Sequence, residues 1–451
     1  MKIHYAPFAV GLLACSLMPA SLSAQQPGSD APPPAEVRRP YRGLFGGPQN
    51  PTAPQSLIAS ASLYGAYDDN VMAGVGGVNR FDPRLQRRGE YVGASAGLTY
   101  ALARENERSW FGLTSGATAN GYFVDADRTL VPHAHATALV GFRVGRYGAL
   151  RLDQQAVYSQ YYRFLVFPSL LGVDDDGALA GDGDLELFER RALRSRSGIG
   201  FSQGIGSRST LSAGYAYGIV NYIDAEFADW RSHNADINYA RRLTARATLN
   251  LGYGHRRMES SLETSRSRAV HDVNAGVTYS RALSFSRRTS FSFSTGSAIL
   301  VRDDLDVPGS DPRANLRLLG DVVLNHEMGR TWTAQAAYKR GIAFREGFDD
   351  PFLTDALSAG ISGLITRRLD MSALARWSFG KLDRPGRTAH DGFVGTVQAR
   401  YALARYVALF ARYLYYQYEF GPDVPLDPGL ARSLDRQGVR VGVTASVPLI
   451  R

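Results

Sequence analysis

The sequence predicts an all-β protein, a transmembrane antiparallel up-and-down β-barrel of about 18 strands. The first observation behind this prediction is the final stretch, residues 438–451, which reads GVRVGVTASVPLIR. Its odd-numbered positions are apolar at Val439, Val441, Val443, Ala445, Val447 and Leu449. Successive side chains of a strand point to opposite faces, so this stretch is a strand with one apolar and one polar face. A last strand of this kind would close a barrel against the first strand.

The second observation is the absence of any long apolar run. A membrane-spanning helix needs roughly 18 or more consecutive apolar residues, and the chain has none. Charged residues make up 21% of the sequence and hydrophobic residues 44%. This average suits a membrane barrel, because half of each strand faces lipid and half faces water.

The N-terminus predicts a cleavable signal peptide over residues 1–24. Lys2 precedes an apolar stretch, and the small residues Ser21 to Ala24 form a cleavage site before Gln25. A lipoprotein signal ending before Cys15 is the alternative. Cys15 is the only cysteine, so cleavage after Ala24 leaves no disulfide and no cysteine metal site.

Residues 25–56 follow as a Pro- and Gly-rich segment without periodicity. We interpret it as a flexible periplasmic leader, with a plug or partner-docking role as the alternative. Residues 57–451 form the predicted barrel.

The barrel region alternates between strands and two kinds of connection. Long polar connections fall near residues 68–89, 125–132, 166–191, 223–229, 259–268, 303–313, 346–353, 382–389 and 421–435. Short turns fall near residues 104–108, 145–148, 205–208, 243–245, 284–288, 329–330, 369–370 and 403–405. Long loops outside and short periplasmic turns are typical of outer-membrane barrels, and this spacing gives about 18 strands. Sixteen strands is the alternative, if two of the weaker strands in the region 146–205 are discounted.

Aromatic residues share the apolar parity of their strands. They are expected to form the interfacial girdles of a membrane barrel. The set is Tyr100, Tyr239, Tyr253, Tyr279, Trp332, Trp377, Tyr401, Tyr413 and Tyr415.

The first strand ends in Gly65 to Val71, which reads GAYDDNV. This motif resembles the opening strand of the outer-membrane β-barrel porin family that includes the barrels of exopolysaccharide operons. The resemblance extends in pattern over about residues 57–451. It implies an outer-membrane barrel with a role in solute passage or polymer export.

The strand face opposite the apolar one should line the pore. Its charged members include Arg143, Asp236, Arg256, Asp321, Lys339, Arg376, Arg400, Arg412 and Arg440. From residue 335 onward, basic residues outnumber acidic ones on this face, which would favour anions. A bracing Arg–Asp network is the alternative. The net charge is +9, but the arginines are scattered along strands, which argues against nucleic-acid binding.

Other candidate sites are weaker. The loop with Asp174, Asp176, Asp182 and Asp184 is a possible cation-binding loop, although it lacks EF-hand spacing. The turn at Asp68 and Asp69 is expected to bond its own backbone. His133 and His135 point to one face, where a metal or simple solvation would suit them. No nucleophile motif is present, so we predict no catalytic residue, metal or cofactor.

The sequence therefore predicts a non-enzymatic channel of the Gram-negative outer membrane, for passive solute passage or exopolysaccharide export. A structural or adhesive barrel and a barrel-rim hydrolase are the alternatives. Expected partners are outer-membrane lipid and lipopolysaccharide, the barrel-assembly machinery, and a polysaccharide or small anionic solute.

Overall fold

The structure of the protein is a computed structural model. It describes residues 43–46, 54–69, 89–103, 108–124, 127–163, 186–223, 229–260, 268–282, 288–302, 314–343, 352–382, 389–424, 426 and 432–450. Among these residues no helix is long and apolar enough to cross a lipid bilayer.

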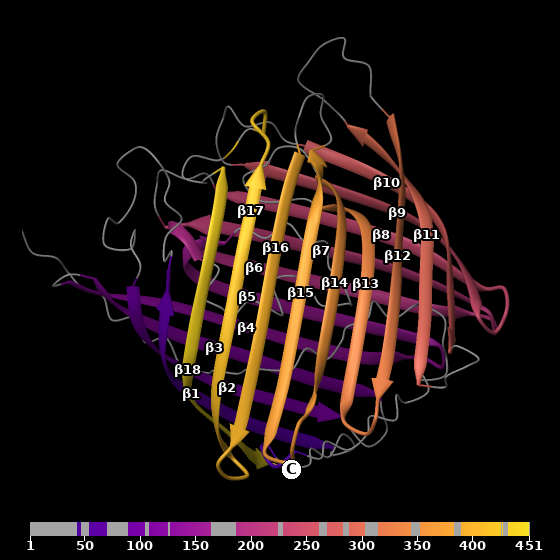
Figure 1. The fold of residues 1–451 in the computed structure, drawn as a ribbon. Coiled ribbons are helices and arrows are strands. Elements are labelled where there is room, and N and C mark those ends of the chain that lie inside the picture. Colours follow the sequence, from indigo (N-terminus) through magenta and orange to yellow (C-terminus); the bar gives the residue numbers. More distant parts are fainter. Residues whose placement is uncertain are drawn as a thin grey trace, which may run out of the picture.

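Eighteen strands form one closed sheet (Figure 1). The strands are β1 (Gln55–Asp68), β2 (Gly89–Ala103), β3 (Ser109–Val124), β4 (Asp127–Val144), β5 (Gly148–Arg163), β6 (Glu186–Ile205), β7 (Ser209–Tyr222), β8 (Trp230–Arg242), β9 (Ala247–Ser260), β10 (Arg268–Ala282), β11 (Thr289–Arg302), β12 (Ala314–Met328), β13 (Trp332–Ala343), β14 (Phe352–Leu364), β15 (Leu369–Leu382), β16 (Ala389–Ala402), β17 (Val407–Phe420) and β18 (Ser433–Ile450). The prediction of an 18-stranded barrel is confirmed.

Every strand pairs antiparallel with its neighbours in sequence, and β1 also pairs with β18. In the closing pair, Leu63 lies opposite Val443 and Tyr67 opposite Val439. The predicted closure of the last strand on the first is therefore confirmed. No connecting loop holds this pair together, so side-chain and backbone contacts alone close the barrel.

Short turns gather at the end of the barrel that also holds the C-terminus (Figure 1). Gly145, Gly206 and Gly329 adopt positive φ in three of them, a conformation that glycine reaches without steric cost.

Three predicted connections are wrong in their bounds. The predicted loop 166–191 is too long, because residues 186–191 belong to β6, and the turn predicted at 369–370 lies at 365–368, before β15 begins. The third is the predicted loop 125–132. Residues 127–132 belong to β4, where Leu130 faces outward at 65% exposed and Val131 inward at 2%. The alternation of outward and inward residues continues through Pro132. The start of this strand could not be recognised in the sequence because its first three residues, 127–129, are polar.

The two faces of the sheet differ in the way the alternation requires. In most strands, large exposed apolar side chains occupy one parity and form the outer surface. They include Leu63, Val92, Leu130, Leu152, Ile199, Ile237, Leu251, Val273, Leu316, Leu357, Val397, Leu409 and Val441. An apolar band of this kind on a closed barrel faces lipid.

Aromatic side chains of the outer face have polar partners toward both rims. Toward the long-loop end, the Tyr253 hydroxyl lies 2.6 Å from His271 Nδ1, and Trp377 Nε1 donates to Asp391 at 2.8 Å. Toward the short-turn end, Gln55 donates to the Tyr100 hydroxyl at 2.9 Å. Apolar rings with bonded polar tips suit the two membrane interfaces.

Candidate functional site: the barrel lumen

The nine predicted pore-lining residues all lie on the strand face opposite the exposed apolar residues. In β18, for example, Val439 and Val441 are 45% and 55% exposed on the outside, whereas Arg440 between them is 8% exposed. The same alternation places the other eight inward: Arg143 on β4, Asp236 on β8, Arg256 on β9, Asp321 on β12, Lys339 on β13, Arg376 on β15, Arg400 on β16 and Arg412 on β17.

The exposure of the inward charged side chains differs between two sides of this inner face. On β4, β8 and β9, the inward residues Arg143, Asp236 and Arg256 are exposed, and we name this side the open wall. Arg196 on β6 is also inward and exposed. Sequence reasoning missed Arg196 because the strands between residues 146 and 205 looked weak. The alternation of Leu193, Ile199 and Phe201 on the outer face would have revealed it.

On the opposite side, from β14 through β18 to β1, several inward arginines are buried. Arg376 is 3% exposed, and the Arg436 side chain is 1% exposed. On β17 the inward side chains that follow Arg412 are apolar or aromatic and buried, namely Leu414, Tyr416, Tyr418 and Phe420. The Tyr416, Tyr418 and Phe420 rings stack along the strand with centroids 5.7 and 5.5 Å apart. On the inner face of this strand, sequence reasoning noted only Arg412.

Inward carboxylates on several strands have basic partners. Asp370 accepts a hydrogen bond from Arg400 Nε at 2.9 Å, and Asp153 lies 3.9 Å from Arg151 Nε. Asp321 accepts a hydrogen bond from the Ser294 hydroxyl and lies opposite Lys339 in the β12–β13 register. These pairings offset negative charge on the inner face, whereas on the open wall three arginines and the carboxylate Asp236 are exposed.

Asp68 and Asp69 of the GAYDDNV motif join β1 to β18 where the barrel closes. Asp68 Oδ2 accepts hydrogen bonds from Arg436 Nε at 2.8 Å and Nη2 at 2.6 Å, and both side chains are almost fully buried. Asp69 exchanges bonds with Gln437: its Oδ1 accepts from the Gln437 N–H at 2.7 Å, and its own N–H donates to the Gln437 carbonyl at 3.1 Å. The expectation that these carboxylates bond their own backbone is therefore wrong, because β18 supplies the partners.

A second inward cluster extends this closure to β2 and β3. The Arg440 guanidinium lies 4.2 Å from the Tyr64 ring centroid, and its Nη2 donates to the Tyr91 hydroxyl at 3.1 Å. The Tyr64 hydroxyl donates to Asn120 at 2.6 Å. Four strands, β18, β1, β2 and β3, are thus linked by side chains inside the barrel.

The remaining predicted sites give no ligand. The loop with Asp174, Asp176, Asp182 and Asp184 lies outside the described residues. His133 and His135 share the inner face with ring centroids 6.0 Å apart, and His133 is 4% exposed and so is not solvated. Within the described ranges, no group of three or more His, Cys, Asp or Glu residues could hold a metal ion.

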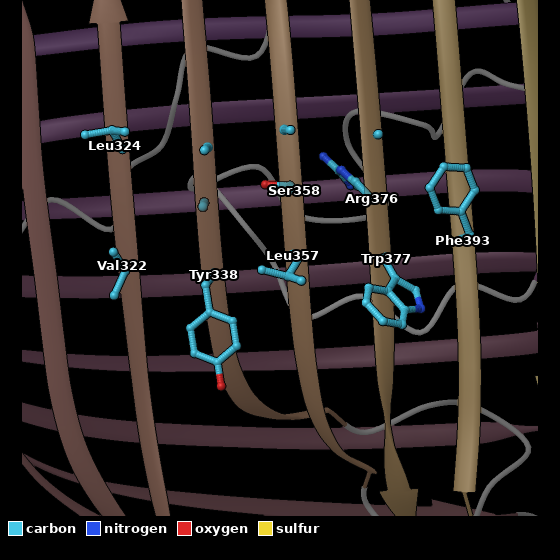
Figure 2. Close-up of a pocket in the computed structure, with 12 residues that line it drawn as sticks. Val322, Leu324, Tyr338, Leu357, Ser358, Arg376, Trp377 and Phe393 are labelled. Atoms are coloured by element: carbon cyan, nitrogen blue, oxygen red, sulfur yellow. The ribbon is translucent and has the colours of Figure 1, made fainter.

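One shallow pocket lies in the wall of β12–β16. Its apolar lining includes Tyr338, Leu357, Trp377 and Phe393, which sit side by side on four neighbouring strands (Figure 2). Leu357 and Trp377 are 41% and 42% exposed on the outer face. This hollow therefore belongs to the lipid-facing surface and not to the lumen.

No protein-family model and no curated protein matches this sequence. Solved barrels with a similar fold include OccK2 (OpdF) of Pseudomonas aeruginosa in complex with glucuronate, at 13% identity and a TM-score of 0.44, covering 88% of this chain and 98% of that chain. OprD of the same species matches at 12% identity and a TM-score of 0.40, covering 92% and 98%. The FrpB iron transporter of Neisseria meningitidis matches at 11% and 0.43, covering 87% and 82%. The likeness is one of barrel architecture.

Proposed function

We propose that this protein is an outer-membrane channel through which small water-soluble solutes pass, with a preference for anions. Its outer face would contact outer-membrane lipid and lipopolysaccharide, with the short turns on the periplasmic side. A barrel of about 18 strands is wide enough for an aqueous path.

The observation that carries the anion preference is the distribution of charge on the inner face. Asp370 and Asp153 lie beside arginines, whereas Arg143, Arg196 and Arg256 are exposed on the open wall. On this wall the three exposed arginines outnumber the exposed carboxylate Asp236, and an excess of positive charge on the wall of a pore raises the local concentration of anions. The field of these arginines therefore favours anions over cations of the same size.

The test is single-channel recording in a planar bilayer with refolded residues 25–451 and a KCl gradient. The reversal potential should have the sign of chloride selectivity. The triple variant Arg143→Gln, Arg196→Gln, Arg256→Gln should move it toward zero. Arg241→Gln, which removes an exposed arginine from the outer face of β8, is the matched control and should leave it unchanged.

Two results would count against this proposal. Cation selectivity in the parent protein would refute the anion preference. A folded barrel that conducts no ions would refute the passive channel and favour polysaccharide export or a structural or adhesive role.

A further inference from the structure

A short piece of the leader lies against the inner wall at the short-turn end of the barrel. Phe45 is 9% exposed and packs on Ala402 and Ala408, which are 1% and 0% exposed. Both alanines lie on the inward parity of β16 and β17. Leu44 packs against the same cluster. Phe45 therefore sits inside the barrel mouth.

The backbone of this segment is bonded to two different turns. The Leu44 N–H donates to the Arg367 carbonyl in the β14–β15 turn at 2.7 Å, and the Gly46 N–H donates to the Arg405 carbonyl in the β16–β17 turn at 2.7 Å. Gly46 adopts a φ of 79°, which favours glycine. The segment thus bridges two turns with a backbone that its own sequence permits.

The inner wall of β15, β16 and β17 around Phe45 has the space and the charge to hold an aromatic ring. The Arg400 guanidinium lies 5.5 Å from the Phe45 ring centroid, within the range of a cation–π contact. Asp370 holds that guanidinium in place through its 2.9 Å bond to Arg400 Nε. The small side chains of Ala402 and Ala408 leave the space that the ring fills.

We propose that this wall is a peptide-docking site whose occupant is the chain's own Leu44–Phe45–Gly46 segment, which latches the leader at the pore mouth. The docked Leu44–Phe45–Gly46 segment occupies part of the mouth and narrows it, a consequence that rests on the proposed channel function.

Docking is tested by cysteine labelling, because residues 25–451 contain no cysteine. In the refolded barrel, Ala408→Cys should react with a polar maleimide at least tenfold more slowly than in the same protein carrying Phe45→Ala. A synthetic peptide of residues 42–47 should slow the labelling of the double variant again, and the same peptide with alanine at position 45 should not.

The matched control is Ser372→Cys, an inward and exposed position on β15. It should label at the same rate with and without the Phe45→Ala substitution, which also verifies that Phe45→Ala leaves the barrel folded. Equal labelling of Ala408→Cys in both backgrounds would overturn the docking site.

Narrowing of the mouth is tested separately by conductance. Phe45→Ala and deletion of residues 25–53 should each raise the single-channel conductance, and unchanged conductance in both would refute the narrowing. If no variant conducts, the leader deletion included, the channel proposal fails while the labelling result still decides the docking site.

Discussion

Replacing Asp68 by asparagine should weaken closure of the barrel more than any other single loss of an inner-face carboxylate. The Asp68 and Arg436 side chains are 2% and 1% exposed, and two guanidinium nitrogens bond one carboxylate oxygen at 2.8 and 2.6 Å. Removing one partner of a buried ion pair costs about 3–5 kcal/mol, because the other charge stays buried without compensation. Asparagine keeps one acceptor oxygen, so we expect the lower value.

The assay is the temperature at which the folded barrel, which migrates fast in unheated SDS gels, converts to the unfolded form. Asp68→Asn should lower this temperature by roughly 3–6 °C. Asp153→Asn is the matched control, since its arginine lies 3.9 Å away and its side chain is 28% exposed. An exposed pair of this kind contributes at most about 1 kcal/mol.

The double variant Asp68→Asn, Arg436→Gln tests whether the two side chains act as a pair. Its loss of stability should be smaller than the sum of the losses in the two single variants, because neither charge is left buried without its partner. Equal effects of Asp68→Asn and Asp153→Asn, or full additivity in the double variant, would contradict a closing role for the buried pair.

Three further predictions concern glycine and the outer face. Gly93→Ala should destabilise the barrel by about 1–3 kcal/mol, because the new methyl group overlaps the Tyr64 ring; Gly65→Ala, which meets nothing within 4 Å, should be nearly neutral in the same melting assay. Gly206→Ala should lower the stability of the barrel by about 1 kcal/mol, because the φ of residue 206 is 70° although its surroundings are open. Gly206→Asn should have a higher melting temperature than Gly206→Ala if the backbone conformation is the cause. Val441→Lys should lower stability in lipid vesicles by about 2–4 kcal/mol if the side chain lies near the bilayer midplane, and an unchanged value would mean that this exposed position does not face lipid.

The strand count and the identity of the two faces could be predicted because they depend on period-two alternation. In β18, an inward small or polar residue lies between each outward valine and the next outward apolar residue. The sequence alone therefore defines both faces of this strand. In β17, both parities carry large apolar or aromatic side chains, and alternation cannot tell an aromatic inner wall from a lipid-facing one. Burial of Tyr416 and Phe420 came only from the structure.

The contacts that close the barrel and hold the leader could not be predicted for a different reason. Asp68 and Arg436 are 368 positions apart, and they meet only because the first and last strands pair. Phe45 lies in a Pro- and Gly-rich segment without periodicity, so no pattern marks it as buried. Its place depends on a ring-sized space between two alanines of neighbouring strands far along the chain.

Inward arginines share one residue type and one parity, yet burial gives them different roles. Arg440 is 8% exposed and holds Tyr64 and Tyr91, so its loss removes contacts among β18, β1 and β2. Arg256 is exposed on the open wall, where its charge acts on the lumen water. A charge exposed to water has a field that salt screens within about 10 Å at 0.1 M. The contribution of Arg256 to selectivity should therefore fall as KCl concentration rises, whereas the contribution of Arg440 to stability should change little.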